Sequence, residues 1–309
     1  MSLKPLTKAA KELRSTAVRA AWRQWSAIFT LAVDESEARA IVDPEALLLA
    51  SIGLGNHEPR LWRACRAWAR VGARLLSVQR TKNLASGLVG DISSGLAEFA
   101  WIAKTEGNDG RWKMLATGAE PSRPKRKERK ATLTLDSPPA LMLRFRLGLG
   151  VGIKPDVLTY LVGLAGGRAT IQQITAATHY YGRAVRRGVE ELVAAGFVQH
   201  WSTAPASYGA DLSRWHELLD IDPKNPPAWH PWASSYAFVL AVSDWLENDP
   251  PSSATVAASE ARDLIAQHSS ALDAAGIPPM ALGKHPGHTF LDPFQQALTS
   301  YAEYIGVVV

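Results

Sequence analysis

The chain has 309 residues, which favours two or three domains rather than one small core. Hydrophobic residues make up 47% and charged residues 20%, a balance that excludes a wholly disordered chain. Cys65 is the only cysteine, so an intramolecular disulfide and a cysteine-based zinc site are both excluded. Charged residues interrupt every long apolar stretch, and no apolar leader follows the basic start. We therefore expect a cytoplasmic protein with no membrane partner.

The net charge of +5 conceals an asymmetry along the chain. Lys and Arg outnumber Asp and Glu by 13 over residues 1–215, whereas the acidic residues are in excess by 8 over residues 216–309. A basic body beside an acidic C-terminal third indicates that a nucleic acid, if one binds, meets the first two thirds. Uneven surface composition without a ligand is the alternative.

Residues 1–118 are predicted to form a helical domain. Asp43-Pro44 and Pro59 are typical helix starts, and apolar residues recur at helical spacing after Pro59. Five arginines share one face of that second helix, and Arg80 and Lys82 extend the basic character beyond it. The five are Arg60, Arg63, Arg66, Arg70 and Arg74. Such a stripe either follows phosphates or pairs with carboxylates of the same fold, and the second interpretation is the more common one.

Residues 119–134 are predicted to be an exposed basic linker, because prolines and cations leave nothing to bury. Cations that need no fixed structure to follow a DNA backbone would add affinity for any sequence. The linker cations assigned to this role are Lys125, Arg126, Lys127, Arg129 and Lys130.

Residues 135–215 carry the pattern with the most information about function. Pro155 begins a helix that Gly166-Gly167 ends, and Thr170 is a good N-cap for a short second helix. A turn over 178–181 leads to a third helix, which stops at Gly196 before a strand. Helix, turn, longer helix and strand is the order of a winged helix-turn-helix.

The stretch "ITAATHYYGRAVRRGVEELVAAGFV" resembles the second and third helices and first wing strand of MarR-, ArsR- and GntR-type bacterial regulators. The preceding "RFRLGLGVGIKPDVLTYLV" resembles, less closely, winged-helix modules paired with nucleotidyltransferase toxins. The first resemblance implies that the third helix enters the major groove of double-stranded DNA. Besides the linker cations, the residues predicted to contact DNA are His179, Tyr180, Tyr181, Arg183, Arg186, Arg187, Thr170, Gln172 and His200.

Two features depart from that family pattern. Tyr181 stands where a Ser or Thr usually caps the third helix, at a cost of about 1 kcal/mol. The predicted wing, residues 199–213, has no Lys or Arg, which places contact between wing and minor groove in doubt.

Residues 216–309 are predicted to form an acidic helical domain whose helices are separated by prolines. The segment from His230 to Leu246 is almost entirely apolar, so it is either central to a core or part of an oligomer interface. We predict a homodimer through helices outside the winged helix. Two further helices are expected over 254–275 and from Asp292 to Ile305.

No sequence motif indicates catalysis or a cofactor. The glycines of "GLGVG" lack the spacing of a dinucleotide fingerprint, and His285 and His288 lie in a loop without carboxylates to complete a metal site. The chain is therefore predicted to be mainly α, with a helical N-terminal domain, a central winged helix-turn-helix and a helical C-terminal domain. Its expected function is sequence-specific DNA binding by a dimeric regulator rather than an enzyme. A protein-interaction module, such as an autoregulating antitoxin bound to a partner enzyme, is the alternative.

Overall fold

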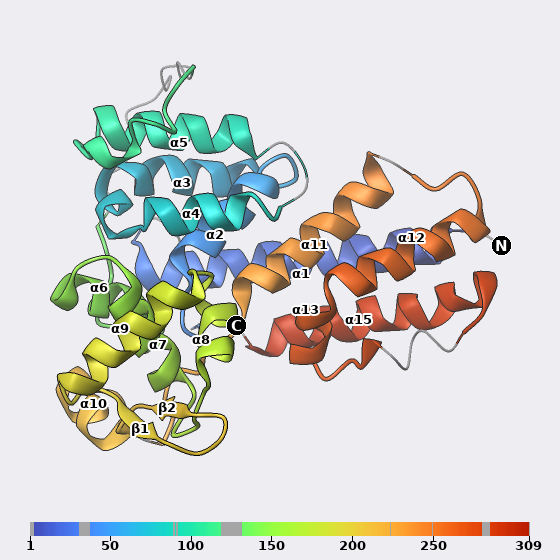
Figure 1. The fold of residues 1–309 in the computed structure, drawn as a ribbon. Helices are drawn as coiled ribbons and strands as arrows, with labels where there is room; N and C mark the ends of the chain where they lie inside the picture. Colours follow the sequence, from blue (N-terminus) through green and yellow to red (C-terminus); the bar gives the residue numbers. More distant parts are fainter. Residues whose placement is uncertain are drawn as a thin grey trace.

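The computed structural model describes residues 3–30, 38–88, 90, 92–118, 132–222, 224–248, 250–279 and 285–308. Over these ranges the protein is mainly helical, with one two-stranded antiparallel sheet, so the predicted fold class is confirmed at that level. Figure 1 shows three groups of elements: α2–α5 at one end, α6–α10 with the sheet below them, and α11–α15 to one side. Helix α1 (Lys4–Ile28) connects the first group to the third.

The first group contains α2 (Pro44–Gly53), α3 (Pro59–Val71), α4 (Val78–Ala85) and α5 (Ser93–Thr105). Side chains before three of these helices accept hydrogen bonds from free backbone N–H groups of the first turn. Asp43 caps α2, Glu58 caps α3 and Ser77 caps α4. Short 3₁₀ turns at Ala73–Leu75 and Gly110–Trp112 follow α3 and α5.

The second group begins with a 3₁₀ turn at Pro138–Ala140. Five helices and two strands follow, namely α6 (Leu141–Leu149), α7 (Ile153–Gly163), α8 (Ile171–Thr178), α9 (Gly182–Ala194), β1 (Gln199–Trp201), β2 (Ser207–Gly209) and α10 (Leu212–Leu219). In the sheet, Gln199 lies opposite Gly209 and Trp201 opposite Ser207. Helix α7 is buried almost all round and contacts α6, α8 and α9, so it forms the centre of this group.

The third group contains α11 (Trp232–Glu247), α12 (Ala254–Gln267), α13 (Ser269–Ala274), a 3₁₀ turn at Gly287–Phe290 and α15 (Leu291–Val308). The helix expected over 254–275 is therefore interrupted, at His268 between α12 and α13. Helix α15 starts within one residue of the predicted position.

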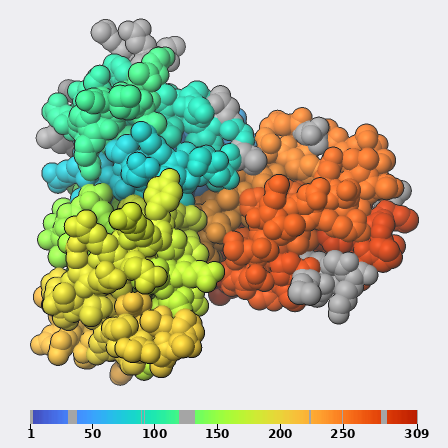
Figure 2. Space-filling model, viewed as in Figure 1, coloured from blue at the N-terminus to red at the C-terminus, as the bar shows by residue number. Residues whose placement is uncertain are grey.

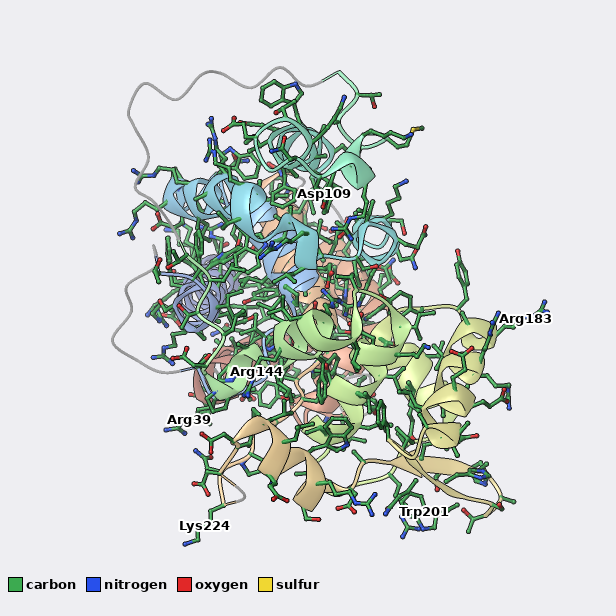
Figure 3. The ribbon with its side chains drawn as sticks, turned by 90° about the vertical axis from the view of Figure 1, so that its left-hand side faces the viewer. Arg39, Asp109, Arg144, Arg183, Trp201 and Lys224 are labelled. Carbon is green, nitrogen blue, oxygen red and sulfur yellow. The ribbon has the colours of Figure 1, made fainter. Side chains whose placement is uncertain are left out.

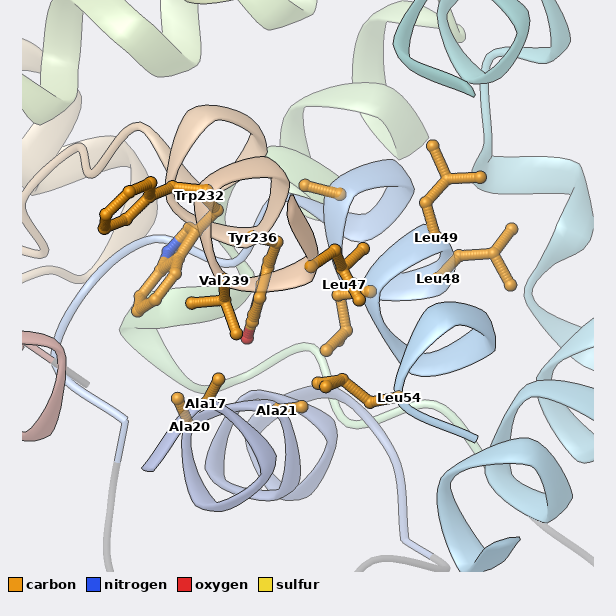
Figure 4. Packing of buried hydrophobic residues seen from close by; sticks show 14 of the residues in the cluster. Ala17, Ala20, Ala21, Leu47, Leu48, Leu49, Leu54, Trp232, Tyr236 and Val239 are labelled. Atoms are coloured by element: carbon orange, nitrogen blue, oxygen red, sulfur yellow. The ribbon is translucent and has the colours of Figure 1, made fainter. Parts of the chain in front are cut away.

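The apolar face of α11 is covered inside the monomer. Trp232, Tyr236 and Val239 pack against alanines of α1 and against Leu47 of α2 (Figure 4). Small residues on α1 let the two helices approach closely, and close packing of this kind gives cores their density. Of the two explanations for the apolar segment, the core is the correct one, and the helix itself gives no reason to expect a second subunit.

The buried residues form two clusters. One runs through α1–α5 and α11–α15 without a break, and the other gathers Ile41 with residues of α6–α10 and the sheet. The N-terminal and C-terminal helices thus bury their apolar faces against each other, although the sequence predicted a domain for each. The predicted boundaries at 118, 134 and 215 stay predictions. No helix among the described ranges combines the length and the apolar character that a membrane span requires.

Candidate nucleic-acid interface

The candidate interface is built on α8, the turn at 179–181 and α9. Thr170 and Gln173 form a reciprocal capping box at the start of α8, as the predicted N-cap role of Thr170 requires. His179 ends α8 in the left-handed conformation, with φ at 57°, which lets the chain reverse within three residues. Helix α9 then buries one side through Val185, Val189 and Leu192. Its N-cap, Tyr181, makes no side-chain cap, as the sequence predicted.

The opposite side of α9 faces solvent. Tyr181, Arg183 and Arg186 are exposed there, and Gln172 is exposed on α8. Within the described chain, neither Arg183 nor Arg186 has an ion pair. Arg187 is exposed too, but its Nε lies 3.0 Å from Oε1 of Glu191, which Lys154 also contacts. In Figure 3, Arg183 projects from the right-hand edge of the molecule and Trp201 lies at its lower edge.

Tyr180 does not belong to this exposed surface. Only 8% of the residue is accessible, against 74% for its neighbour Tyr181. Its hydroxyl donates a hydrogen bond of 2.8 Å to Oδ2 of Asp156, a buried carboxylate of α7. The side chain that the sequence assigned to DNA contact therefore points into the protein, where the hydroxyl satisfies a charged acceptor.

His179 occupies an intermediate position between surface and core. Burial lowers the pKa of its imidazole to about 4, and the positive charge of Arg80 adds to this shift. The ring is therefore neutral near pH 7 and brings no positive charge to a phosphate. Its backbone carbonyl accepts a hydrogen bond of 3.1 Å from the Asn83 side chain of α4.

The hairpin of β1 and β2 carries a cation that the sequence analysis missed. The guanidinium carbon of Arg168 lies 3.8 Å from the ring centroid of Trp201, stacked on β1. Arg168 is exposed and precedes Ala169, which pairs with Tyr208 of β2 in an isolated antiparallel bridge. Arg168 lies outside residues 199–213, so a count of Lys and Arg over that range does not include it. The bridge between Ala169 and Tyr208 brings it next to the hairpin.

Glycine at position 209 makes room for this stack. A Cβ at Gly209 would lie 3.2 Å from the Trp201 ring, so the indole lies closely against β2. On the same hairpin, His200 is exposed and its ring stacks on Tyr208 with centroids 5.0 Å apart. The hairpin thus carries a guanidinium and an imidazole, each stacked on an aromatic ring.

Beneath the interface, two arginines and three carboxylates form a buried network. Asp43, Glu45, Arg80, Arg146 and Asp156 are each at most 2% exposed. Arg80 makes two bonds of 2.6 Å to Asp43 and one of 2.7 Å to Glu45. Arg146 binds Glu45 at 2.6 Å and Asp156 at 2.7 and 2.8 Å. Bidentate pairing of this kind compensates the large cost of removing the charges from water.

This network connects the turn at 179–181 to the first group of helices. The Nε of Arg80 donates to the carbonyl of Thr178 at 2.9 Å, and Tyr180 binds Asp156. Burial alone would raise the pKa of Asp43, but the charge and hydrogen bonds of Arg80 hold that pKa below its usual value. Arg80 is thus an internal ion-pair partner, so the basic character that it adds after α3 does not reach the surface.

The predicted arginine stripe does not lie on one helix, because α3 ends at Val71 and Arg74 lies in the 3₁₀ turn Ala73–Leu75. Most of the five arginines are paired with carboxylates. Arg60 contacts Glu58 at 2.7 Å, Arg66 contacts Glu98 at 3.5 Å and Arg70 contacts Glu106 at 2.6 Å. The remaining two members, Arg63 and Arg74, are exposed. Pairing within the fold, the commoner of the two interpretations, thus describes three of the five arginines.

The linker cations Lys125, Arg126, Lys127, Arg129 and Lys130 fall outside the described residues. The described ranges hold no group of three or more His, Cys, Asp or Glu side chains suited to a metal ion, and these ranges include His285 and His288.

Comparison with known proteins does not extend this description, since no family model, curated protein or solved structure matches the chain.

Proposed function

We propose that residues 135–215 form a winged helix-turn-helix and that the protein binds double-stranded DNA through α9. The observation that carries this proposal is the pair of exposed arginines, Arg183 and Arg186, on the N-terminal half of a helix whose other side is buried. The major groove admits one α-helix, and an arginine there binds guanine O6 and N7 in a bidentate manner. The N-terminal end of a recognition helix is the part that reaches base edges.

The order of elements supports the same proposal. Helix α7 is followed by the bridging residue Ala169, by α8 and α9, and then by the hairpin, whose strand β2 pairs with Ala169. A winged helix has this order, with three short strands beside three helices. Thr170 and Gln172 at the start of α8 and His200 on the hairpin flank α9 and suit phosphate contacts.

DNA binding is tested most directly by removing the two arginines singly. Arg183→Ala and Arg186→Ala are each expected to weaken binding to a duplex selected from a random pool by about 1–3 kcal/mol, or roughly 5- to 150-fold in Kd. Arg39→Ala is the matched control, because Arg39 is exposed at the opposite edge of the molecule in Figure 3. Fluorescence anisotropy measures all three, and circular dichroism checks that each variant is folded. Equal Kd values for the three variants and the parent would refute the assignment.

The linker cations add a separate expectation. Neutralising all five should weaken binding to every duplex about equally. It should also flatten the slope of log affinity against log salt concentration, by roughly 0.9 for each phosphate that the protein no longer neutralises. An unchanged slope, together with unchanged binding by the α9 variants, would favour the alternative of a surface that docks a protein. The absence of Lys and Arg from residues 199–213 is the feature that favours this alternative.

The homodimer remains a proposal with less support than DNA binding. The apolar segment that suggested an oligomer interface is covered by α1 and α2 within the monomer. Sedimentation equilibrium at tens of micromolar distinguishes a dimer from a monomer, and a monomer at that concentration would remove the dimer from the proposed mechanism.

A further inference from the structure

A cavity of about 220 Å³ lies directly behind the turn that precedes α9. Its walls come from α2, from α4 and the turn after it, from α11 and from α12–α13, and His179 closes the side next to α9. The three groups of helices meet around it, near the centre of the view in Figure 2. A bound molecule there would contact the turn and the C-terminal helices at the same time.

The lining of the cavity is divided between an apolar floor and a polar rim. Buried Ala46, Leu49 and Ala50 of α2 form part of the floor. Side chains with hydroxyl, amide or imidazole groups also line it, namely Asn83, His179, Ser234, Gln267, His268 and Ser270. Tyr236 lines it too, but its hydroxyl accepts a hydrogen bond from Gln24 of α1. Among the residues that the structure describes, the lining contains no Asp, Glu, Lys or Arg. An ion bound there would lose its hydration without gaining a counter-charge, so the lining selects against charged ligands.

The two imidazoles are uncharged near neutral pH. Burial lowers the pKa of His179 to about 4, and burial also lowers the pKa of His268. A neutral imidazole offers one donor and one acceptor, which suits an amide or a ring nitrogen. At about 220 Å³ the cavity is smaller than most pockets for drug-sized ligands, which measure roughly 300–1,000 Å³, so the occupant is small.

We propose that this cavity binds a small neutral ring compound bearing an amide or similar hydrogen-bonding edge. We also propose that a bound compound changes the position of α9. The second part rests on the proposed function, because it concerns DNA binding. The physical link is short: His179 lines the cavity, its carbonyl is bound by Asn83, and α9 begins three residues later. Asn83 also lines the cavity, so both partners of that bond lie against a bound molecule.

Nicotinamide is the probe, because it is a neutral amide on a flat ring. Saturation-transfer NMR and a titration should give a Kd on the order of 1 mM, the affinity expected of so small a ligand. Nicotinate has the same shape with a negative charge and should not bind. Ala237→Leu on α11 and Ser270→Leu on α13 fill the cavity from two sides and should each raise the Kd about fivefold or more, whereas Ala266→Leu, on an exposed part of α12, should leave it unchanged.

The outcomes separate the two parts of the proposal. No binding of nicotinamide, equal binding of nicotinate, or equal Kd values for the filling variants and Ala266→Leu would each overturn the site. With the site established, saturating nicotinamide should change the Kd for a DNA duplex about fivefold or more, and it should not do so in Ser270→Leu. An unchanged Kd would overturn the link to α9. If the protein bound no duplex at all, the proposed function would fail while the NMR titration still decided the site.

Discussion

The adjacent tyrosines of the turn provide a sharp test of the buried network, because the same small change should lower the stability at one of them and leave it nearly unchanged at the other. Tyr180→Phe removes one hydroxyl from the protein interior and preserves the ring. Tyr181→Phe removes the corresponding hydroxyl from a side chain that is 74% exposed and has no buried partner to lose. The prediction is that the first variant is destabilised and the second is not.

The magnitude follows from the acceptor. Oδ2 of Asp156 receives the Tyr180 hydroxyl at 2.8 Å and Arg146 at 2.8 Å, and Asp156 is fully buried. Without the Tyr180 hydroxyl, this oxygen keeps only its hydrogen bond from Arg146. Water cannot reach Asp156 to replace the lost bond. Hydrogen bonds to charged groups contribute about 1.5–3 kcal/mol. Arg146 still holds the carboxylate, so we expect a decrease of about 2 kcal/mol in the free energy of unfolding for Tyr180→Phe and less than about 0.5 kcal/mol for Tyr181→Phe.

Urea unfolding followed by tryptophan fluorescence measures both free energies of unfolding. The midpoint should fall in Tyr180→Phe without a change in slope, which would show that the same surface is exposed on unfolding. Equal midpoints for the two variants would refute the reasoning, because they would mean that the Tyr180 hydroxyl has no charged partner in solution.

Three further predictions concern other parts of the structure. Arg80→Met should destabilise the protein by about 3–5 kcal/mol or prevent folding, since buried carboxylates lose their counter-ion, whereas Arg74→Met at an exposed position should change the urea midpoint little. Burial lowers the pKa of His230 to about 3. As the pH falls below about 6.5, this histidine is therefore protonated in the unfolded chain but stays neutral in the folded protein. Stability should therefore decline from pH 6.5 toward pH 4, and His230→Gln should decline less steeply; parallel urea midpoints over that range would contradict this. Arg168→Ala should weaken DNA binding at low salt and reduce the salt dependence by about one phosphate contact, as anisotropy titrations would show, and an unchanged salt slope would exclude the hairpin cation from the interface.

The sequence contained enough information to predict most of the helices. Helical spacing and capping residues are local properties, which is why the Thr170 cap, α9 and α15 were predicted close to their observed positions. The weak cap at Tyr181 was also predictable, because it depends on a single residue.

The sequence could not determine which charged and aromatic residues lie inside. Tyr180 and Tyr181 are neighbours in a turn, where no helical period separates buried from exposed positions, and the partner of Tyr180 is 24 residues earlier. Arg80 finds its carboxylates 35 and 37 residues away, so the sequence alone could not show that it pairs inside the fold. Arg168 reaches Trp201 only through the bridge between Ala169 and Tyr208, a pairing that no local pattern predicts.

The buried network limits how the candidate DNA-binding segment can be moved or reused. A fragment cut at 135 and 215 would retain Arg146 with Asp156 but lose Glu45, and the turn would lose the hydrogen bonds that Arg80 and Asn83 donate to it. Charges and carbonyls that are satisfied in the whole chain would then face water or one another. A chimera that transplants this segment onto another protein would therefore have to carry α2 and α4 with it, and the smallest transferable unit of this protein is larger than the segment that resembles a regulator.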